Sequence, residues 1–308
     1  MKPLHSTILA TGILLLLGRQ TMYAQNAGAS QPVDPRWTAI RQVFGQAGEV
    51  HDGYFRVNLP RSDLGVRIGG DALESPFEFT SYVGFVPVGA GDVLAMGEYV
   101  LRDDEVATVL TELLRQGIPT PALHNHLIGE SPRIMYIHVM ARGPAASVAS
   151  KLRAAFAKSA TPLTPPLESH ASIDWTTVDA ILGTHSEASG HVAEYEFPRR
   201  EQMTVDGVAV KSSGLLETAS EVVFQQLANG RVACGGELFV LPSEIEAVAH
   251  ALDEHGLHVT AIHNHMLDQT PRMYWMHWYG TGDQESLARG VASALAHMNS
   301  VRKSSGEQ

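Results

Sequence analysis

The sequence predicts an α+β fold, made by tandem duplication of a βαββα-containing module with mostly antiparallel sheets. Two observations lead to this prediction. A seventeen-residue segment at 122–138 recurs at 261–277, and the same order of strand-like and helix-like patterns surrounds each copy. Strand, helix, two strands and helix, in that order, indicate a sheet covered by helices.

The duplication is visible residue by residue. Residues 122–138 read ALHNHLIGESPRIMYIH and residues 261–277 read AIHNHMLDQTPRMYWMH, so that seven of the seventeen positions are identical. Most of the others exchange one apolar residue for another. The same spacing of 139 residues relates Gly97-Glu98 to Gly236-Glu237 further upstream. We conclude that the chain contains two copies of one module.

Each module contains the same series of predicted elements. Alternating apolar residues and turn signals predict hairpins of 81–88 with 93–101 and of 221–227 with 232–241. Apolar residues at helical spacing predict opening helices (37–44, 175–182), middle helices (103–116, 243–254) and closing helices (145–157, 284–297). Ser243, with Glu246 three residues later, is expected to cap the second middle helix. Two strands before each closing helix carry the repeated segment.

The two ends and one internal stretch are predicted to lie outside the modules. Lys2 and His5 precede an apolar run and then small residues, which is the order of a secretory signal peptide over 1–29. Module one is assigned to 33–158 and module two to 172–300. The proline-rich residues 159–171 form the predicted linker, and 301–308 a disordered tail. We therefore expect a periplasmic or secreted protein.

Composition narrows the classes of partner. The formal net charge of −11 disfavours nucleic acid, whose binding requires a basic surface. No cysteine lies near the predicted cleavage point, so no membrane anchor is expected after signal cleavage. Cys234 is the one cysteine, which excludes an internal disulfide. It is interpreted as a buried strand residue, with an additional soft metal ligand as the alternative.

The repeated segment carries a set of side chains that suits a divalent transition metal. His124 and His126 are two residues apart on a predicted strand, so both side chains leave the same face, and His138 follows on the next strand. Glu98 can join them if its strand neighbours the His-x-His strand. Module two repeats the set as Glu237, His263, His265 and His277.

Three imidazoles and a carboxylate are ligands of Zn²⁺, the first candidate, and also of Cu, Mn, Fe or Ni. With three histidines bound, a fourth position would remain for water, and Glu98 or Glu237 would act as ligand or as catalytic base. The alternative is that the histidines are core residues whose hydrogen bonds to loop backbone satisfy them. Whether each module has its own site or both form one composite site is left open.

Two arginines also repeat, directly before the strand with the third histidine. Arg133 and Arg272 are expected to bind a small anionic substrate, because a guanidinium pairs with carboxylate or phosphate in a fixed geometry. For Arg133 a structural salt bridge to Glu130 is an equal alternative. Three functions follow: a metal-dependent hydrolase or lyase, a non-catalytic metal or ligand carrier, and a structural envelope protein with packed histidines.

The chain resembles the LppY/LpqO family of exported bacterial proteins, whose domain has no established function. NLPRSDLGVRIGG (58–70), MGEYVLRDDEV (96–106) and the two His-Asn-His segments carry the resemblance. The resemblance implies export and a repeated domain over nearly all of the mature chain. It implies no reaction and no catalytic residues.

Overall fold

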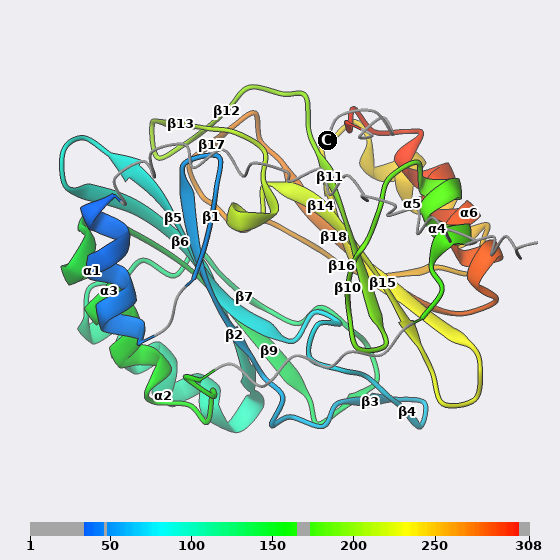
Figure 1. The fold of residues 1–308 in the computed structure, drawn as a ribbon, viewed down its shortest axis with the longest axis horizontal. Helices are drawn as coiled ribbons and strands as arrows, with labels where there is room; N and C mark the ends of the chain where they lie inside the picture. The colour runs from blue at the N-terminus through cyan, green and yellow to red at the C-terminus, as the bar shows by residue number, and fades with distance from the viewer. Residues whose placement is uncertain (1–33, 46–47, 165–172, 302–308) are drawn as a thin grey trace, which may run out of the picture. The chain divides into compact units, whose positions relative to one another are not determined.

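The architecture is built on two six-stranded antiparallel sheets with the same strand order, one in each module (Figure 1). The computed structural model describes residues 34–45, 48–164 and 173–301. The first sheet has the order β1 (Glu49–His51), β2 (Tyr54–Pro60), β5 (Thr80–Val88), β6 (Asp92–Arg102), β9 (Ile134–Pro144) and β7 (Ala122–His124). The second has the order β10 (Glu187–Ser189), β11 (Val192–Pro198), β14 (Ala219–Gln226), β15 (Val232–Val240), β18 (Tyr274–Gly282) and β16 (His258–His263).

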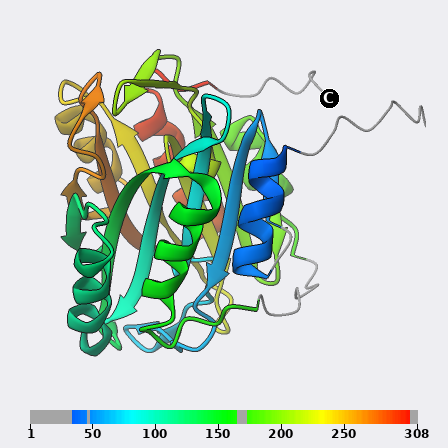
Figure 2. The ribbon, with the colours of Figure 1, turned by 90° about the vertical axis from the view of Figure 1, so that its left-hand side faces the viewer.

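Helices cover one face of each sheet. These are α1 (Pro35–Phe44), α2 (Asp103–Arg115) and α3 (Ala145–Phe156) in module one, and α4 (Thr176–Leu182), α5 (Ile245–Asp253) and α6 (Gln284–Leu295) in module two. Figure 2 shows α1 and α3 in front of the first sheet, covering one of its faces. Two small sheets, β4 (Asp71–Ala72), β3 (Arg67–Ile68), β8 (Glu130–Ser131) and β13 (Val208–Val210), β12 (Met203–Val205), β17 (Gln269–Thr270), and a 3-10 helix η1 (Gly214–Leu216) complete the fold.

The predicted α+β duplication is confirmed, and the hydrophobic patterns explain it. In module one the inward residues of strands and helices form a core in which Trp37 stacks on Phe55 with ring centroids 5.4 Å apart. Burying each such side chain stabilises the fold by about 1.5–3 kcal/mol. Module two has a separate core of the same kind, and Cys234 is fully buried within it. Burial raises the pKa of this thiol.

The opposite faces of the two sheets meet. Apolar clusters there combine residues of both modules, such as Val100 with Val223 and Met96 with Trp275. The face-to-face packing therefore places the strands of one module against those of the other, with polar side chains of both enclosed between them.

A buried arginine ties the start of the middle helix to the sheet in each module. Arg61 pairs with Asp63 and Glu105, at 2.9 and 3.0 Å. The matching residues of module two are Arg199, Glu201 and Glu244, and both ion pairs there measure 2.8 Å. Both guanidinium groups are fully buried.

Two local predictions are wrong. Ser243 does not cap α5, which begins at Ile245 with no side-chain cap hydrogen bond. The carboxylate of Glu244 instead accepts a hydrogen bond from the Leu241 amide at 2.8 Å, so the turn is closed by another side chain. The strand β7 ends at His124, so that His126 lies in the following loop and not on the strand.

Several other predictions fall on residues outside this description. The predicted signal peptide lies outside the described residues, as do positions 165–171 of the linker and everything after Val301. Among the described residues no helix is long and apolar enough to cross a membrane.

Candidate metal centre

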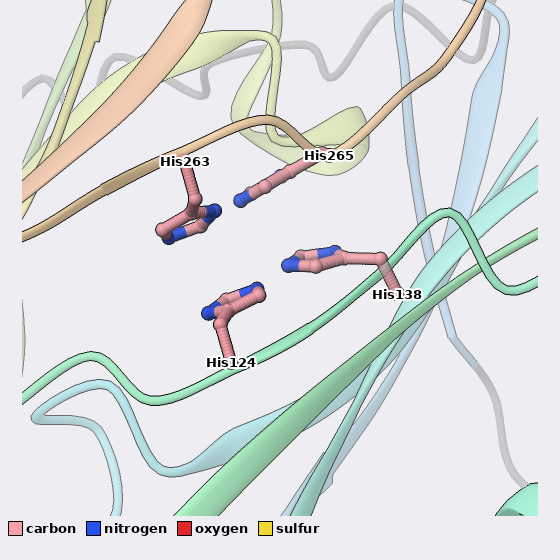
Figure 3. A group of neighbouring side chains, drawn as sticks. All are labelled: His124, His138, His263 and His265. Atoms are coloured by element: carbon pink, nitrogen blue, oxygen red, sulfur yellow. The ribbon is translucent and has the colours of Figure 1, made fainter.

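The six histidines of the repeated segments come together between the two sheets. His124 and His263 end β7 and β16, whereas His138 and His277 lie within β9 and β18. Each ring of one module stacks on a ring of the other. The ring centroids are 3.6 Å apart for His124 with His263, 3.6 Å for His138 with His265, and 3.7 Å for His126 with His277. Figure 3 shows four of these rings approaching from the two modules. The modules thus share one cluster.

The register of the central strands places the two predicted glutamates. Glu98 on β6 is directly opposite His138 on β9, and Glu237 on β15 is opposite His277 on β18. The strand of Glu98 therefore neighbours the strand of the third histidine and not the His-x-His strand, and Glu98 joins the cluster from there. A glycine precedes each glutamate because a Cβ there would collide with a backbone carbonyl of the adjacent strand.

Two further glutamates, Glu78 and Glu217, complete the cluster, and motif analysis alone missed them. They occupy positive-φ positions before β5 and β14, at φ 64° and 49°. Oε1 of Glu78 accepts a hydrogen bond from Nδ1 of His277 at 3.1 Å. Glu217 lies 3.7 Å from Nδ1 of His265. They are again 139 residues apart, so the repeat spacing is the signal that could have found them.

Two of the four carboxylates lie beside Nδ1 atoms of the histidine rings, and the other two lie beside Nε2 atoms. Glu78 and Glu217 face Nδ1 atoms. Glu98 faces Nε2 atoms, with Oε2 3.0 Å from His138 and 3.4 Å from His126. Glu237 faces the Nε2 atoms of His265 and His277 at 4.0 and 3.9 Å. A carboxylate on Nδ1 holds an imidazole so that Nε2 is free for a metal.

Several sets of ligand atoms lie within 4.8 Å of one another, as a metal site requires. One set comes from module one and one from module two, and a third mixes both modules. They are Glu98, His124, His126 and His138; Glu237, His265 and His277; and His124, His138, His263 and His265. Nitrogen and carboxylate donors at such spacing are typical of Zn²⁺ and its neighbours in the first transition series.

Most polar atoms of the cluster have no hydrogen-bond partner. Nine imidazole nitrogens and three carboxylate oxygens are buried and unpartnered, among them both ring nitrogens of His124, His126 and His265. The contact of Glu98 with His138, although 3.0 Å long, lies outside hydrogen-bond geometry. Each buried unsatisfied group costs about 1–3 kcal/mol. Apart from the 3.5 Å contact of His263 Nδ1 with the Asn264 carbonyl, backbone hydrogen bonds do not satisfy these nitrogens, which does not favour the alternative of packed core histidines.

Burial and neighbouring charges set the protonation of the cluster. Burial lowers the pKa of His124, His138, His263, His265 and His277, which favours neutral rings. A neutral imidazole is the form that binds a metal.

His126 and Glu78 differ from the rest of the cluster. Burial opposes the charge of His126, but Glu98 and Glu78 outweigh it and raise its pKa to about 9. Burial also opposes the charge of Glu78, yet His277 and His126 lower its pKa to about 2. Module one thus holds an internal ion pair in the metal-free cluster.

Comparison with known proteins identifies the repeated unit. The family described as "Domain of Unknown Function (DUF1259)" matches residues 38–158 and again 176–297. The chain belongs to this family. A search of curated proteins gave no significant match. A search of solved structures found a trimeric bacterial microcompartment shell protein, PduB, with 10% identity and a TM-score of 0.21, covering 83% of this chain and 96% of that one. At that TM-score the likeness carries no inference.

The two matching arginines of the DUF1259 repeats, Arg133 and Arg272, do not lie at the cluster. Arg133 and Arg272 are exposed, in the turns that precede β9 and β18, whereas the next residues, Ile134 and Met273, are buried. Neither arginine lines the cavity of about 770 Å³ that adjoins the cluster. This placement does not support the expectation that they hold a substrate at the metal.

Proposed function

We propose that the cluster binds divalent transition metal, with Zn²⁺ the first candidate and Cu, Mn, Fe or Ni as alternatives. The observation that carries the proposal is the group of twelve buried, unpartnered imidazole and carboxylate atoms. Metal coordination would satisfy these atoms, and their free-energy cost in its absence is large. Glu98 and the module-one histidines would form one ligand set, and Glu237 with the module-two histidines the other.

The positions of the carboxylates support distinct roles. Glu78 and Glu217 would orient the imidazoles through Nδ1, as carboxylates do in carboxylate–histidine–metal arrangements. Glu98 and Glu237 lie beside the Nε2 atoms and also line the adjoining cavity. From there each could bind metal or move a proton at its free oxygen. A bound Zn²⁺ would supply a Lewis acid and lower the pKa of a water.

The cavity favours an enzyme over a carrier that saturates its metal. Its lining includes His126, His277, Glu98 and Glu237, so a small molecule could reach the centre from that side. We therefore propose a metal-dependent hydrolase or lyase. The predicted signal peptide at 1–29 and the LppY/LpqO-like segments support export to the periplasm or medium. The mass of the mature N-terminus from a cell fraction would test that part.

Metal content of untagged protein tests the proposal directly. After incubation with Zn, Cu, Mn, Fe and Ni ions and exhaustive dialysis, we expect at least one ion per chain by elemental analysis. The double variant His138→Gln, His277→Gln, which keeps side-chain volume, should lose most of the metal. His185→Gln, an exposed histidine outside the cluster, is the matched control. A folded wild-type chain that takes up none of the five metals would overturn the proposal.

A further inference from the structure

The cavity beside the cluster has the size of a ligand site. Its volume of about 770 Å³ falls within the range of roughly 300–1,000 Å³ that is typical of small-molecule pockets. Two floor residues, Glu98 and Glu237, are more than nine-tenths buried, and each has an unpartnered carboxylate oxygen. A single ion would not fill such a volume, whereas a small organic molecule would.

The wall contributed by module two is acidic. Glu194 on β11 and Glu221 on β14 line the cavity, and Glu221 is directly opposite Glu237 in the strand register. Like charges opposite each other on a sheet are destabilising. Within the described part of the chain, the side-chain carboxyl groups of Glu194 and Glu221 accept no hydrogen bond and have no cationic group within 4.0 Å, although the charge of Arg56 acts on both at longer range. Two carboxyl groups without a close partner at these positions favour a ligand that carries a positive charge.

The corresponding wall of module one already holds a guanidinium. Arg56 is the match of Glu194, and Tyr82 is the match of Glu221. The Arg56 guanidinium lies 3.9 Å from the centroid of the Tyr82 ring, and its Nε donates to Asn58 at 2.6 Å. It also donates to the Gly214 carbonyl of module two. An aromatic face, a carbonyl and carboxylates thus already bind one cation here.

The balance of charge remains negative after metal loading. Two divalent ions would match the four carboxylates of the cluster, which leaves the lining residues Glu49, Glu187, Glu194 and Glu221 against Arg56. The other arginine of the lining, Arg61, is already paired with Asp63 and Glu105. Burial and the charge of Glu221 raise the pKa of Glu194 to about 8 although Arg56 lowers it, so Glu194 is mostly neutral in the empty cavity at pH 7, and a cationic nitrogen beside it would lower that pKa and restore its charge.

We propose that this cavity binds a small molecule with a positively charged nitrogen, an amine or guanidinium, which faces Glu194 and Glu221. The remainder of the molecule lies toward the metal centre between Glu98 and Glu237. This inference rests on the proposed metal centre. It replaces the expected anionic substrate, because Arg133 and Arg272 lie outside the cavity.

Three probes of nearly equal shape separate charge from size. Metal-loaded, full-length mature protein is titrated calorimetrically with butylguanidinium, butylurea and pentanoate. We expect butylguanidinium to bind about tenfold more tightly than butylurea, because its hydrogen bonds to carboxylates are charge-assisted, and pentanoate to bind most weakly. Equal binding of all three, tighter binding of pentanoate, or no binding of any would overturn the inference.

Substitutions of Glu194 and Glu221 test whether these two residues cause the preference for the charged probe. Glu194→Gln and Glu221→Gln should each reduce the preference for butylguanidinium over butylurea about tenfold and leave the metal content unchanged. Glu246→Gln, an exposed acid on α5 outside the cavity lining, controls for net charge. If the wall variants behave like this control, the inference fails while the metal centre stands. If the wild-type protein carries no metal, the proposed function fails instead.

Discussion

Corresponding glutamates and histidines of the two modules differ in charge. Glu98 and His126 are ionised, whereas Glu237 and His265 are neutral. In module one, burial is outweighed by His126, which holds the pKa of Glu98 well below its usual range, and His126 itself is protonated. In module two, burial and the neighbouring acids raise the pKa of Glu237, and burial lowers that of His265. Glu98 contacts its histidines at 3.0 and 3.4 Å, whereas Glu237 lies 3.9 and 4.0 Å from its own.

A neighbour on the adjacent strand adds to the effects of burial and of Glu217 in raising the pKa of Glu237. Tyr82 is opposite Glu98, but Glu221 is opposite Glu237, so module two adds a like charge where module one has a neutral phenol. The backbone positions of the cluster are duplicated, whereas the residues around them have diverged. We infer that the duplication preserves the positions of the cluster residues, and that the surrounding residues determine which of them are protonated in each module.

Acid should produce the largest effect on the metal-free protein. Five cluster histidines have lowered pKa values, so they stay neutral when folded and bind protons when unfolded below pH 6.5. Their stabilising contribution is present above pH 6.5 and is lost as the pH falls, by up to about 1.4 kcal/mol per pH unit for each. We expect the metal-free chain to unfold in mildly acidic buffer, as measured by urea titrations from pH 5 to 9.

His126 should act in the opposite direction. Its pKa of about 9 means that its contribution is present below pH 6.5 and is lost as the pH rises toward 9. The variant His126→Gln should therefore flatten the alkaline limb, and His265→Gln should reduce the slope of the acid limb. A profile in which both variants change the same limb would refute the difference between the modules.

Local patterns were sufficient to predict the fold. The helix expected at 103–116 is observed at Asp103–Arg115, and the strand expected at 232–241 at Val232–Val240. These elements depend on hydrophobic periodicity within one segment, and this pattern is visible in consecutive residues of the sequence. The pairing of rings from the two modules could not be predicted in this way, since it depends on packing between residues far apart in the chain.

The candidate site was only partly predictable for the same reason. The six histidines and the two glutamates after glycine repeat within recognisable motifs. Glu78 and Glu217 lie in irregular turns with no periodicity, where only the spacing of the repeat marks them. Arg133 and Arg272 are exposed because they lie in the turns before β9 and β18, and the repetition of a residue type does not show whether its side chain is exposed.

The buried arginines should show equal effects in the two modules, in contrast to the cluster. Arg61→Met and Arg199→Met each remove the buried cation that pairs with two carboxylates, and we expect each to lower the free energy of unfolding by about 3–5 kcal/mol. Arg289→Met, which breaks an exposed pair with Glu285, should cost about 0.5 kcal/mol or less. Urea unfolding of the metal-free chain at pH 7 measures all three. Unequal costs at the two buried sites would show that divergence reaches the structural pairs as well.

The smallest predicted effect is the most specific to the cluster. In the metal-free protein at pH 7, Glu98→Gln removes the charged partner of His126 and should cost about 1–3 kcal/mol. Glu237→Gln replaces a carboxyl group whose raised pKa already keeps it protonated, so the change should stay within about 0.5 kcal/mol. Urea unfolding compares the two variants on the same scale.

A third substitution tests whether the neighbouring strand causes that inequality. Glu221→Tyr gives Glu237 the phenolic neighbour that Tyr82 provides for Glu98, and removing the like charge should lower the pKa of Glu237. The carbonyl stretch of a protonated carboxyl group, seen in infrared spectra of the wild type and lost in Glu237→Gln, should then weaken at pH 7. If the band keeps its full intensity in Glu221→Tyr, burial and Glu217 are sufficient to keep Glu237 protonated, and the difference between the modules does not originate at residue 221.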